Sequence, residues 1–117
     1  MSKLELCKET TDLDVILNLT RDENPKIRLK AIQQICPCRV QKDIDTFWKR
    51  IFEMVDDPDA EVRRQILHDI CDGSPAHLEQ QVLEALEKFN HDSDGLIRRK
   101  VHRVMAIYKS TGKWNVL

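Results

Sequence analysis

The sequence predicts an all-α protein in which three helix pairs stack into an α-α superhelix, or solenoid. Residue types recur with a period of 35 residues over most of the chain. Within each period the apolar residues are three and four positions apart, which is the spacing of one face of an α-helix. The 117 residues include only three Gly and four Pro, and no segment alternates as a β-strand does. Each period is therefore interpreted as one helix pair.

Polar and apolar positions carry the repeat together. The polar positions are Asp22, Asp57 and Asp92, followed six residues later by Arg28, Arg63 and Arg98. The apolar positions are Leu13/Trp48/Leu83, Ile16/Ile51/Leu86, Leu19/Met54/Phe89, Ala31/Ile66/Val101 and Ile35/Ile70/Met105. Because no gap is needed to keep them in register, chance similarity is a poor explanation for the pattern.

The chain is expected to form a single domain, residues 1–117, with three units at about 11–42, 43–75 and 76–110. The expected helices are 11–20, 25–36, 43–55, 60–71, 76–90 and 95–109. We expect residues 1–10, with Leu4, Leu6 and Cys7, to cover the first unit. The tail 111–117 either folds over the open end of the third unit or docks a partner.

Turn residues mark the corner inside each unit. The segments RDENP, DDPDA and HDSDG place Asn24, Asp59 and Asp94 where N-cap residues are needed, and Pro25 at a first helical position. Between the second and third units, DGSP predicts Gly73 as a left-handed C-cap, Ser74 as an N-cap and Pro75 as the first helical residue.

The pattern resembles the HEAT repeat, a helix-pair unit that stacks into solenoids. The resemblance rests on an Asp in the turn and an Arg six residues later, in three copies across residues 11–109. It implies a right-handed stack with an Asp–Arg ladder, in which each Arg bridges the turns of its own and the neighbouring unit. The guanidinium suits this role because it offers five donors in a planar fork. This chain departs from the usual HEAT pattern in having no proline within the first helix of a unit.

In HEAT-like solenoids the second helices line the concave side, which usually binds. The implied binding surface comprises Leu29, Ile32 and Gln33, then Arg64, Leu67 and His68, then Arg99, His102 and Arg103. We expect it to change from apolar to basic along the chain and to accept a peptide or helix with an apolar and an acidic part. The alternative is a solvated polar end with no binding role.

Charge is distributed unevenly along the chain. Residues 95–117 carry six basic residues and no acidic one, whereas residues 1–94 hold all 20 acidic residues against 13 basic ones, which is a charge of −7. The expected function is a non-enzymatic protein-interaction module or assembly adaptor. The alternative is binding of nucleic-acid phosphates by the basic third repeat, although the acidic part would repel a polyanion. Head-to-tail self-association through the solenoid ends is a third option.

Two stretches hold residue types that metals and enzymes use, namely ILHDICDGSPAH at 66–77 and CPC at 36–38. Zinc would accept Cys36, Cys38, His68 and Cys71, but their spacing matches no zinc signature and buried thiols are common. The preferred interpretation is plain core or surface cysteines, with no metal and no cofactor. A disulfide between Cys36 and Cys71 would need Cα atoms closer than neighbouring helices usually allow.

Catalysis is not expected. The pairs His68-Asp69 and His91-Asp92 resemble adjacent ligands of HD-type phosphohydrolases, but Asp92 belongs to the ladder and the other ligands are missing. No Gly-rich phosphate loop occurs, nor a Ser or Cys nucleophile with a credible base. Four cysteines, an N-terminus without an apolar signal region and the lack of a long apolar run favour a cytoplasmic protein with reduced thiols.

Overall fold

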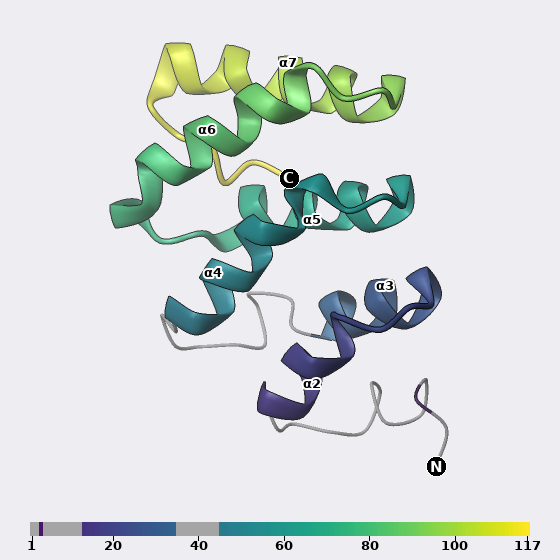
Figure 1. Ribbon diagram of the computed structural model, residues 1–117. Coiled ribbons are helices and arrows are strands. Elements are labelled where there is room, and N and C mark those ends of the chain that lie inside the picture. The colour runs from purple at the N-terminus through teal and green to yellow at the C-terminus, as the bar shows by residue number, and fades with distance from the viewer. Residues whose placement is uncertain (1–2, 4–12, 35–44) are drawn as a thin grey trace.

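Residues 3, 13–34 and 45–117 are described by the computed structural model of the protein (Figure 1). Every regular element in this part is helical, which confirms the all-α prediction. The elements are α2 (Leu13–Leu19), α3 (Pro25–Gln34), α4 (Asp45–Glu53), the 3-10 turn η1 (Met54–Asp56), α5 (Ala60–Gly73), the 3-10 turn η2 (Ala76–Leu78), α6 (Glu79–Asn90) and α7 (Gly95–Thr111). None of these helices is long and apolar enough to cross a membrane.

The turn residues start α3, α5 and α7 at the predicted positions. Asp59 and Asp94 have extended backbones, and each side chain accepts a hydrogen bond from the backbone N–H three residues later, at 3.0 and 3.2 Å. Pro25 is the first residue of α3, directly after Asn24. An N-cap bond satisfies a donor that the first helical turn leaves open and typically contributes about 1 kcal/mol.

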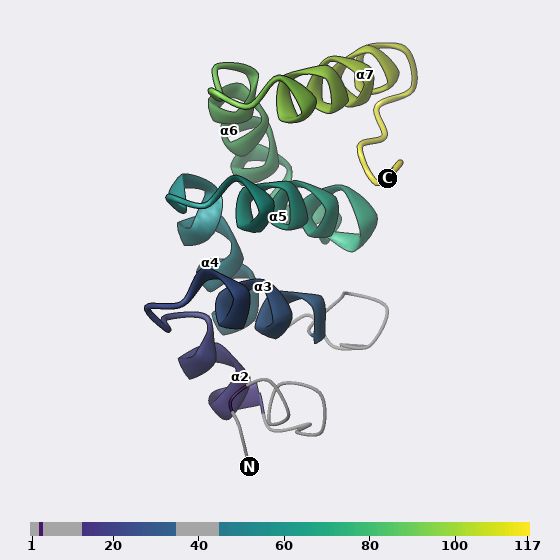
Figure 2. The same cartoon turned by 90° about the vertical axis from the view of Figure 1, so that its right-hand side faces the viewer.

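The helices form two layers. In both views α3, α5 and α7 lie side by side along the molecule, and α2, α4 and α6 lie against them (Figures 1 and 2). Helix α5 contacts α3 on one side and α7 on the other, while α2 packs on α3 and α6 on α7. The molecule measures 47 × 30 × 18 Å, so its long axis runs across the successive helices.

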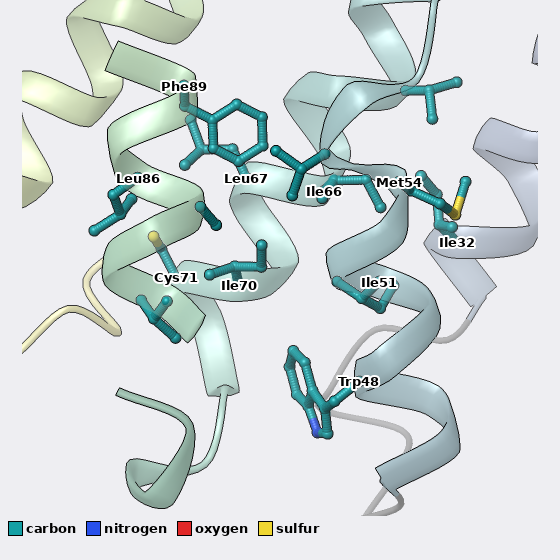
Figure 3. Close-up of a cluster of buried hydrophobic side chains, with 14 of the residues drawn as sticks. Ile32, Trp48, Ile51, Met54, Ile66, Leu67, Ile70, Cys71, Leu86 and Phe89 are labelled. Atoms are coloured by element: carbon teal, nitrogen blue, oxygen red, sulfur yellow. The ribbon is translucent and has the colours of Figure 1, made fainter. Parts of the chain in front are cut away.

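One continuous apolar cluster fills the space between the layers. The equivalent residues Ala31, Ile66 and Val101 are all fully buried. Figure 3 shows Ile66 and Ile70 of α5 between Ile51 of α4 and side chains of α6. Burial of an aliphatic side chain of this size contributes about 1.5–3 kcal/mol. The spacing of three and four residues in the sequence thus corresponds to the core-facing side of each helix.

The end of α5 differs from the prediction. Gly73 is the last residue of α5 and is not left-handed, whereas Gly112, which ends α7, is the glycine with a left-handed backbone (φ 74°) among the described residues. Ser74 ends α5 instead of capping the next helix, and Pro75 precedes η2 instead of beginning it. The reason is that Ser74 Oγ donates back to the carbonyl oxygen of Ile70 at 2.6 Å, so it closes the helix behind it.

The C-terminal tail folds back beside α5 (Figure 2). Trp114 is buried, and its indole Nε1 donates to Ser74 Oγ at 2.6 Å. The backbone nitrogen of Leu117 donates to the carbonyl oxygen of Cys71 at 3.0 Å. The tail therefore packs on the core and joins α7 to the end of α5, which agrees with the expectation of a tail that folds over the core and not with a free docking segment. The expected N-terminal cover, residues 1–10, lies outside the described residues apart from Lys3.

Candidate interaction surface

Two bidentate ion pairs connect consecutive turns of the chain. Arg28 donates through Nε and Nη2 to the two carboxylate oxygens of Asp57, at 2.9 and 3.0 Å. Arg63 forms the same pair with Asp92, at 2.9 and 3.1 Å. Two parallel N–H···O bonds are the strongest geometry for Arg and a carboxylate. Each of these two arginines thus holds the aspartate of the next turn.

The third arm of each ladder arginine binds its own turn. Nη1 of Arg28 donates to the carbonyl oxygen of Asp22 at 2.8 Å, and Nη1 of Arg63 donates to that of Asp57 at 2.8 Å. Nη1 of Arg98 donates to the carbonyl oxygen of Asp92 at 2.5 Å. Arg28 and Arg63 therefore bridge their own turn and the next one, as predicted. Arg98 binds its own turn only.

The paired aspartates also fix their own turns. Oδ1 of Asp57 accepts from the backbone nitrogen of Asp59 at 2.9 Å, and Oδ1 of Asp92 accepts from that of Asp94 at 2.8 Å. The Asp57 and Asp92 side chains are only 6% and 8% exposed. The hydrogen bond to Asp92 raises the pKa of Arg63, so this arginine stays charged. Loss of one partner would leave a poorly hydrated charge behind.

A second arginine pairs with the next turn in the middle of the molecule. Arg64 donates through Nε and Nη2 to Asp94, at 2.8 and 2.9 Å. This bond, together with the N-cap bond from Ile97, lowers the pKa of Asp94 to about 2. The first unit has Leu29 at the position of Arg64, so no such pair forms there. Arg64, predicted as a binding residue, is thus partly engaged inside the molecule.

The row of pairs ends differently at its two extremes. At its start, Nζ of Lys3 forms an ion pair with Asp22, which lowers the pKa of that carboxyl group. At its end, Arg98 and Arg99 are exposed. Within the part of the chain that the structure describes, neither has a carboxylate partner. Lys3 therefore binds Asp22 as a preceding ladder arginine would. Arg98, at the other end of the ladder, has no carboxylate partner among the described residues.

The prediction that Ile32 and Leu67 belong to the binding surface is wrong. Ile32 and Leu67 are fully buried in the core and cannot line a binding surface. The reason is that α5 is sandwiched between α3 and α7 as well as against the other layer, so two adjacent stripes of the helix are covered. Leu29 is partly buried against the same core. The predicted change from an apolar to a basic surface therefore loses its apolar part.

The accessible part of the predicted surface is cationic. Arg99, His102 and Arg103 are exposed on α7, and His68 is partly exposed on α5. Nε2 of His102 lies 2.8 Å from Oδ1 of Asn90. Other accessible or half-buried cations, which the prediction omitted, are Lys26 and Lys30 on α3 and Lys100 on α7. Lys30 and Lys100 share one repeat position, two residues after the ladder arginine, whereas the equivalents of Lys26 are Glu61 and Leu96.

The candidate metal and catalytic residues do not meet in one place. Cys71 is fully buried, and burial raises the pKa of its thiol to about 12, while His68 on the same helix is partly exposed. Cys36 and Cys38 lie outside the described residues. Across residues 13–34 and 45–117, no three His, Cys, Asp or Glu side chains are grouped so that they could hold a metal ion. Asp92 of the His-Asp pair is bound by Arg63.

Asp69 is a polar residue that sequence reasoning left without a role. It is fully buried; Oδ1 accepts from Gln65 at 2.9 Å, and Oδ2 has no hydrogen-bond partner. Burial raises its pKa to about 8. The equivalent residue in the third unit is the buried Val104, so the position belongs to the core. Asp69 therefore influences stability rather than an accessible site.

Comparison with known proteins identifies no relative of this chain. No protein-family model, no curated protein and no solved structure matches this chain significantly.

Proposed function

We propose that the chain is a small HEAT-type solenoid that acts as a protein-interaction module or assembly adaptor, without chemistry of its own. The stacked arrangement is supported by the ladder pairs Arg28–Asp57 and Arg63–Asp92, which repeat with the sequence period. The side-by-side packing of α3, α5 and α7 supports it further. The cysteine usage favours the cytoplasm as the location.

One observation carries the functional part of the proposal. Arg99 and Arg103 are exposed on α7, and residues 95–117 contain no acidic residue to neutralise them. Lys26 and Lys30 extend the cationic character over α3, the helix at the other end of the same layer. A protein partner with an acidic segment fits this surface by charge. The earlier expectation of a partner with an apolar part is dropped, because Ile32 and Leu67 are buried.

The proposal is tested by affinity capture with the wild-type chain and an Arg99→Glu/Arg103→Glu variant. We expect one or more proteins to be retained by the wild type and lost with the variant. The purified candidate must then bind the purified wild-type chain directly, with affinity that falls as salt rises. If wild type and variant retain the same proteins to the same extent, the surface has no such role.

Nucleic acid is the rival ligand, favoured by the six basic residues after position 94. The two aromatic residues near them form a poor platform for base stacking, because Trp114 is buried and the ring of Tyr108 packs partly against the core and Trp114. A gel shift with random duplex DNA and RNA tests this alternative. Binding that persists at physiological salt and is lost in the Arg99→Glu/Arg103→Glu variant would favour it over a protein partner.

A further inference from the structure

We propose that Arg98 and Arg99 form a receptor for an Asp-x-Asp turn of a partner protein, at the place where the turn of a fourth helix pair would stand. This inference rests on the proposed function, because it names the ligand for one end of the same cationic surface.

The arrangement one period earlier supplies the template. Arg63 and Arg64 are adjacent in sequence, and they bind Asp92 and Asp94 of the next turn, each through two hydrogen bonds. Arg98 and Arg99 repeat the Arg-Arg pair 35 residues later. Two guanidinium groups on one helical turn thus recognise two carboxylates separated by one residue. The same residues in the same register predict the same ligand.

Arg98 is already oriented for this ligand. Its Nη1 donates to the carbonyl oxygen of Asp92, as Nη1 of Arg28 and Arg63 do to the carbonyls of their own turns. In Arg28 and Arg63 this bond leaves the Nε–Nη2 edge for the carboxylate of the next turn. The same edge of Arg98 is therefore presented to a ligand with little further loss of side-chain entropy.

In the described part of the chain, no carboxylate is paired with this edge. Residues 95–117 contain no Asp or Glu, and the carboxylates of the preceding turn, Asp92 and Asp94, are paired with Arg63 and Arg64 and not with Arg98 or Arg99. The opposite end of the ladder is closed, because Lys3 pairs with Asp22. The asymmetry makes the Arg98 end the accessible one.

The side of α7 that faces away from α5 indicates that the ligand is a single turn of the partner and not a complete fourth helix pair. Leu67 and Cys71 of α5 are fully buried, and their equivalents in α7 are the exposed His102 and Ala106. A further stacked helix would need apolar residues there, as α7 needs them on α5. The ligand is thus held mainly by its carboxylates, which gives weak and salt-sensitive binding.

A second copy of this chain is a poorer occupant. Stacked head to tail, it would present the turn 22–24, in which Asp22 and Glu23 carry carboxylates but Asn24 places an amide where the second aspartate of an Asp-x-Asp turn stands. The Asp22 carboxylate is already paired with Lys3. The turns with two aspartates are also engaged: Arg28 binds Asp57, and Arg63 with Arg64 binds Asp92 and Asp94. We therefore propose a turn of a partner protein as the occupant.

The test is an NMR titration of the whole ¹⁵N-labelled chain, in which the Arg Nε–Hε signals report on the side chains directly. The probe is a blocked synthetic peptide with the sequence of residues 90–97, NHDSDGLI, which contains the turn that Arg63 and Arg64 bind. We expect saturable shifts of the Arg98 and Arg99 signals with a dissociation constant on the order of 1 mM at low salt. The control peptide has both aspartates replaced by asparagine, and its affinity should be at least about tenfold weaker.

Variants separate recognition from general attraction. Arg98→Gln and Arg99→Gln should each weaken peptide binding by about tenfold, whereas Lys109→Gln, which removes an exposed charge near the other end of the same helix, should weaken it by less than about threefold. Equal effects at all three positions, or no shift of the Arg98 and Arg99 signals, would overturn the inference. Circular dichroism checks that each variant is folded.

Two further results would indicate a ligand other than an Asp-x-Asp turn and would overturn the inference. Inorganic phosphate that shifts the same signals at lower concentration than the peptide would point to nucleic acid. Sedimentation that reveals a dimer of the wild-type chain, lost in Arg98→Gln, would point to a second copy. If the peptide fails while affinity capture still finds an Arg99- and Arg103-dependent protein, the proposed function stands and only the Asp-x-Asp ligand is rejected.

Discussion

Asp57 links the two ladder arginines through different groups. Its carboxylate accepts two hydrogen bonds from Arg28, and its carbonyl oxygen accepts one from Arg63. Arg63 in turn binds the carboxylate of Asp92. The first, second and third turns are therefore connected by a chain of charge-assisted bonds through partly buried side chains.

Arg63→Lys should destabilise the fold because an ammonium group cannot form the bidentate bond to Asp92 and also reach the carbonyl of Asp57. We expect the free energy of unfolding to fall by about 1–3 kcal/mol in urea denaturation. Arg98→Lys is the matched control. It changes the equivalent, exposed residue, which has no carboxylate partner in the described structure, and should alter stability by less than about 0.5 kcal/mol. Equal losses in the two variants would rule out a special contribution from the Arg63–Asp92 pair.

Asp69 should make stability depend on pH. In the unfolded chain its carboxyl group loses the proton near the model value of 3.8, whereas in the folded protein the pKa is about 8. Between these values the unfolded state binds fewer protons, so stability falls as pH rises from about 4 to about 8.

The Asp69→Asn variant isolates this effect, because other titrating groups are common to both proteins. Its stability relative to the wild type should increase by about 2–4 kcal/mol from pH 4 to pH 8 in parallel urea denaturations. A difference that stays constant over this range would mean that Asp69 is not held in its neutral form in the folded protein.

The tail should contribute to stability through Trp114. Ser74→Ala removes the oxygen that accepts the buried indole N–H at 2.6 Å, and we expect a loss of about 1–3 kcal/mol. Val116→Ala, at a position 37% exposed in the same tail, is the control and should cost less than about 0.5 kcal/mol. Quenching by acrylamide gives a second readout, because the Trp114 fluorescence should become more accessible in Ser74→Ala. A stable Ser74→Ala protein with unchanged quenching would show that the tail does not depend on this bond.

Cys71 should be chemically inert in the folded protein, because its thiol is fully buried with a pKa of about 12. Iodoacetamide labelling followed by peptide mapping measures each cysteine separately. We expect Cys71 to react at least about 100-fold more slowly in buffer than in concentrated urea, at a rate that follows unfolding. Rapid labelling in buffer would place this thiol at the surface and reopen the hypothesis that it binds a metal.

The periodic part of the structure could be predicted because every repeated contact has a repeated residue. The turns at Asp57 and Asp92 and the buried positions Ala31, Ile66 and Val101 recur at a fixed interval, so three copies reinforce one another. The burial of Leu67 was also readable. Its equivalents are Ile32 and His102, and a position that becomes polar only in the last unit is one that faces the following unit.

Contacts that occur once have no such signal. The bond between Trp114 and Ser74 joins residues 40 apart in the chain and has no counterpart elsewhere in the described structure. Arg50 binds the hydroxyl and the carbonyl oxygen of Thr20 at 2.9 and 3.0 Å, but the equivalent of Arg50 in the third unit is Ala85. The closure of the ladder by Lys3 likewise depends on a residue outside the repeat. Sequence periodicity cannot reveal such contacts, because local residue types do not determine them.

The most direct test of the account is a double-mutant cycle across the first ladder step, Arg28→Gln with Asp57→Asn, followed by urea denaturation. Because these side chains form one bidentate pair, the two changes should be coupled by about 1–3 kcal/mol. The control cycle pairs Asp57→Asn with Arg98→Gln and should be additive to within about 0.5 kcal/mol. Coupling in the first cycle alone is the predicted result. Additivity in both cycles would contradict the ladder, and with it the stacking in register from which the open end at Arg98 was inferred.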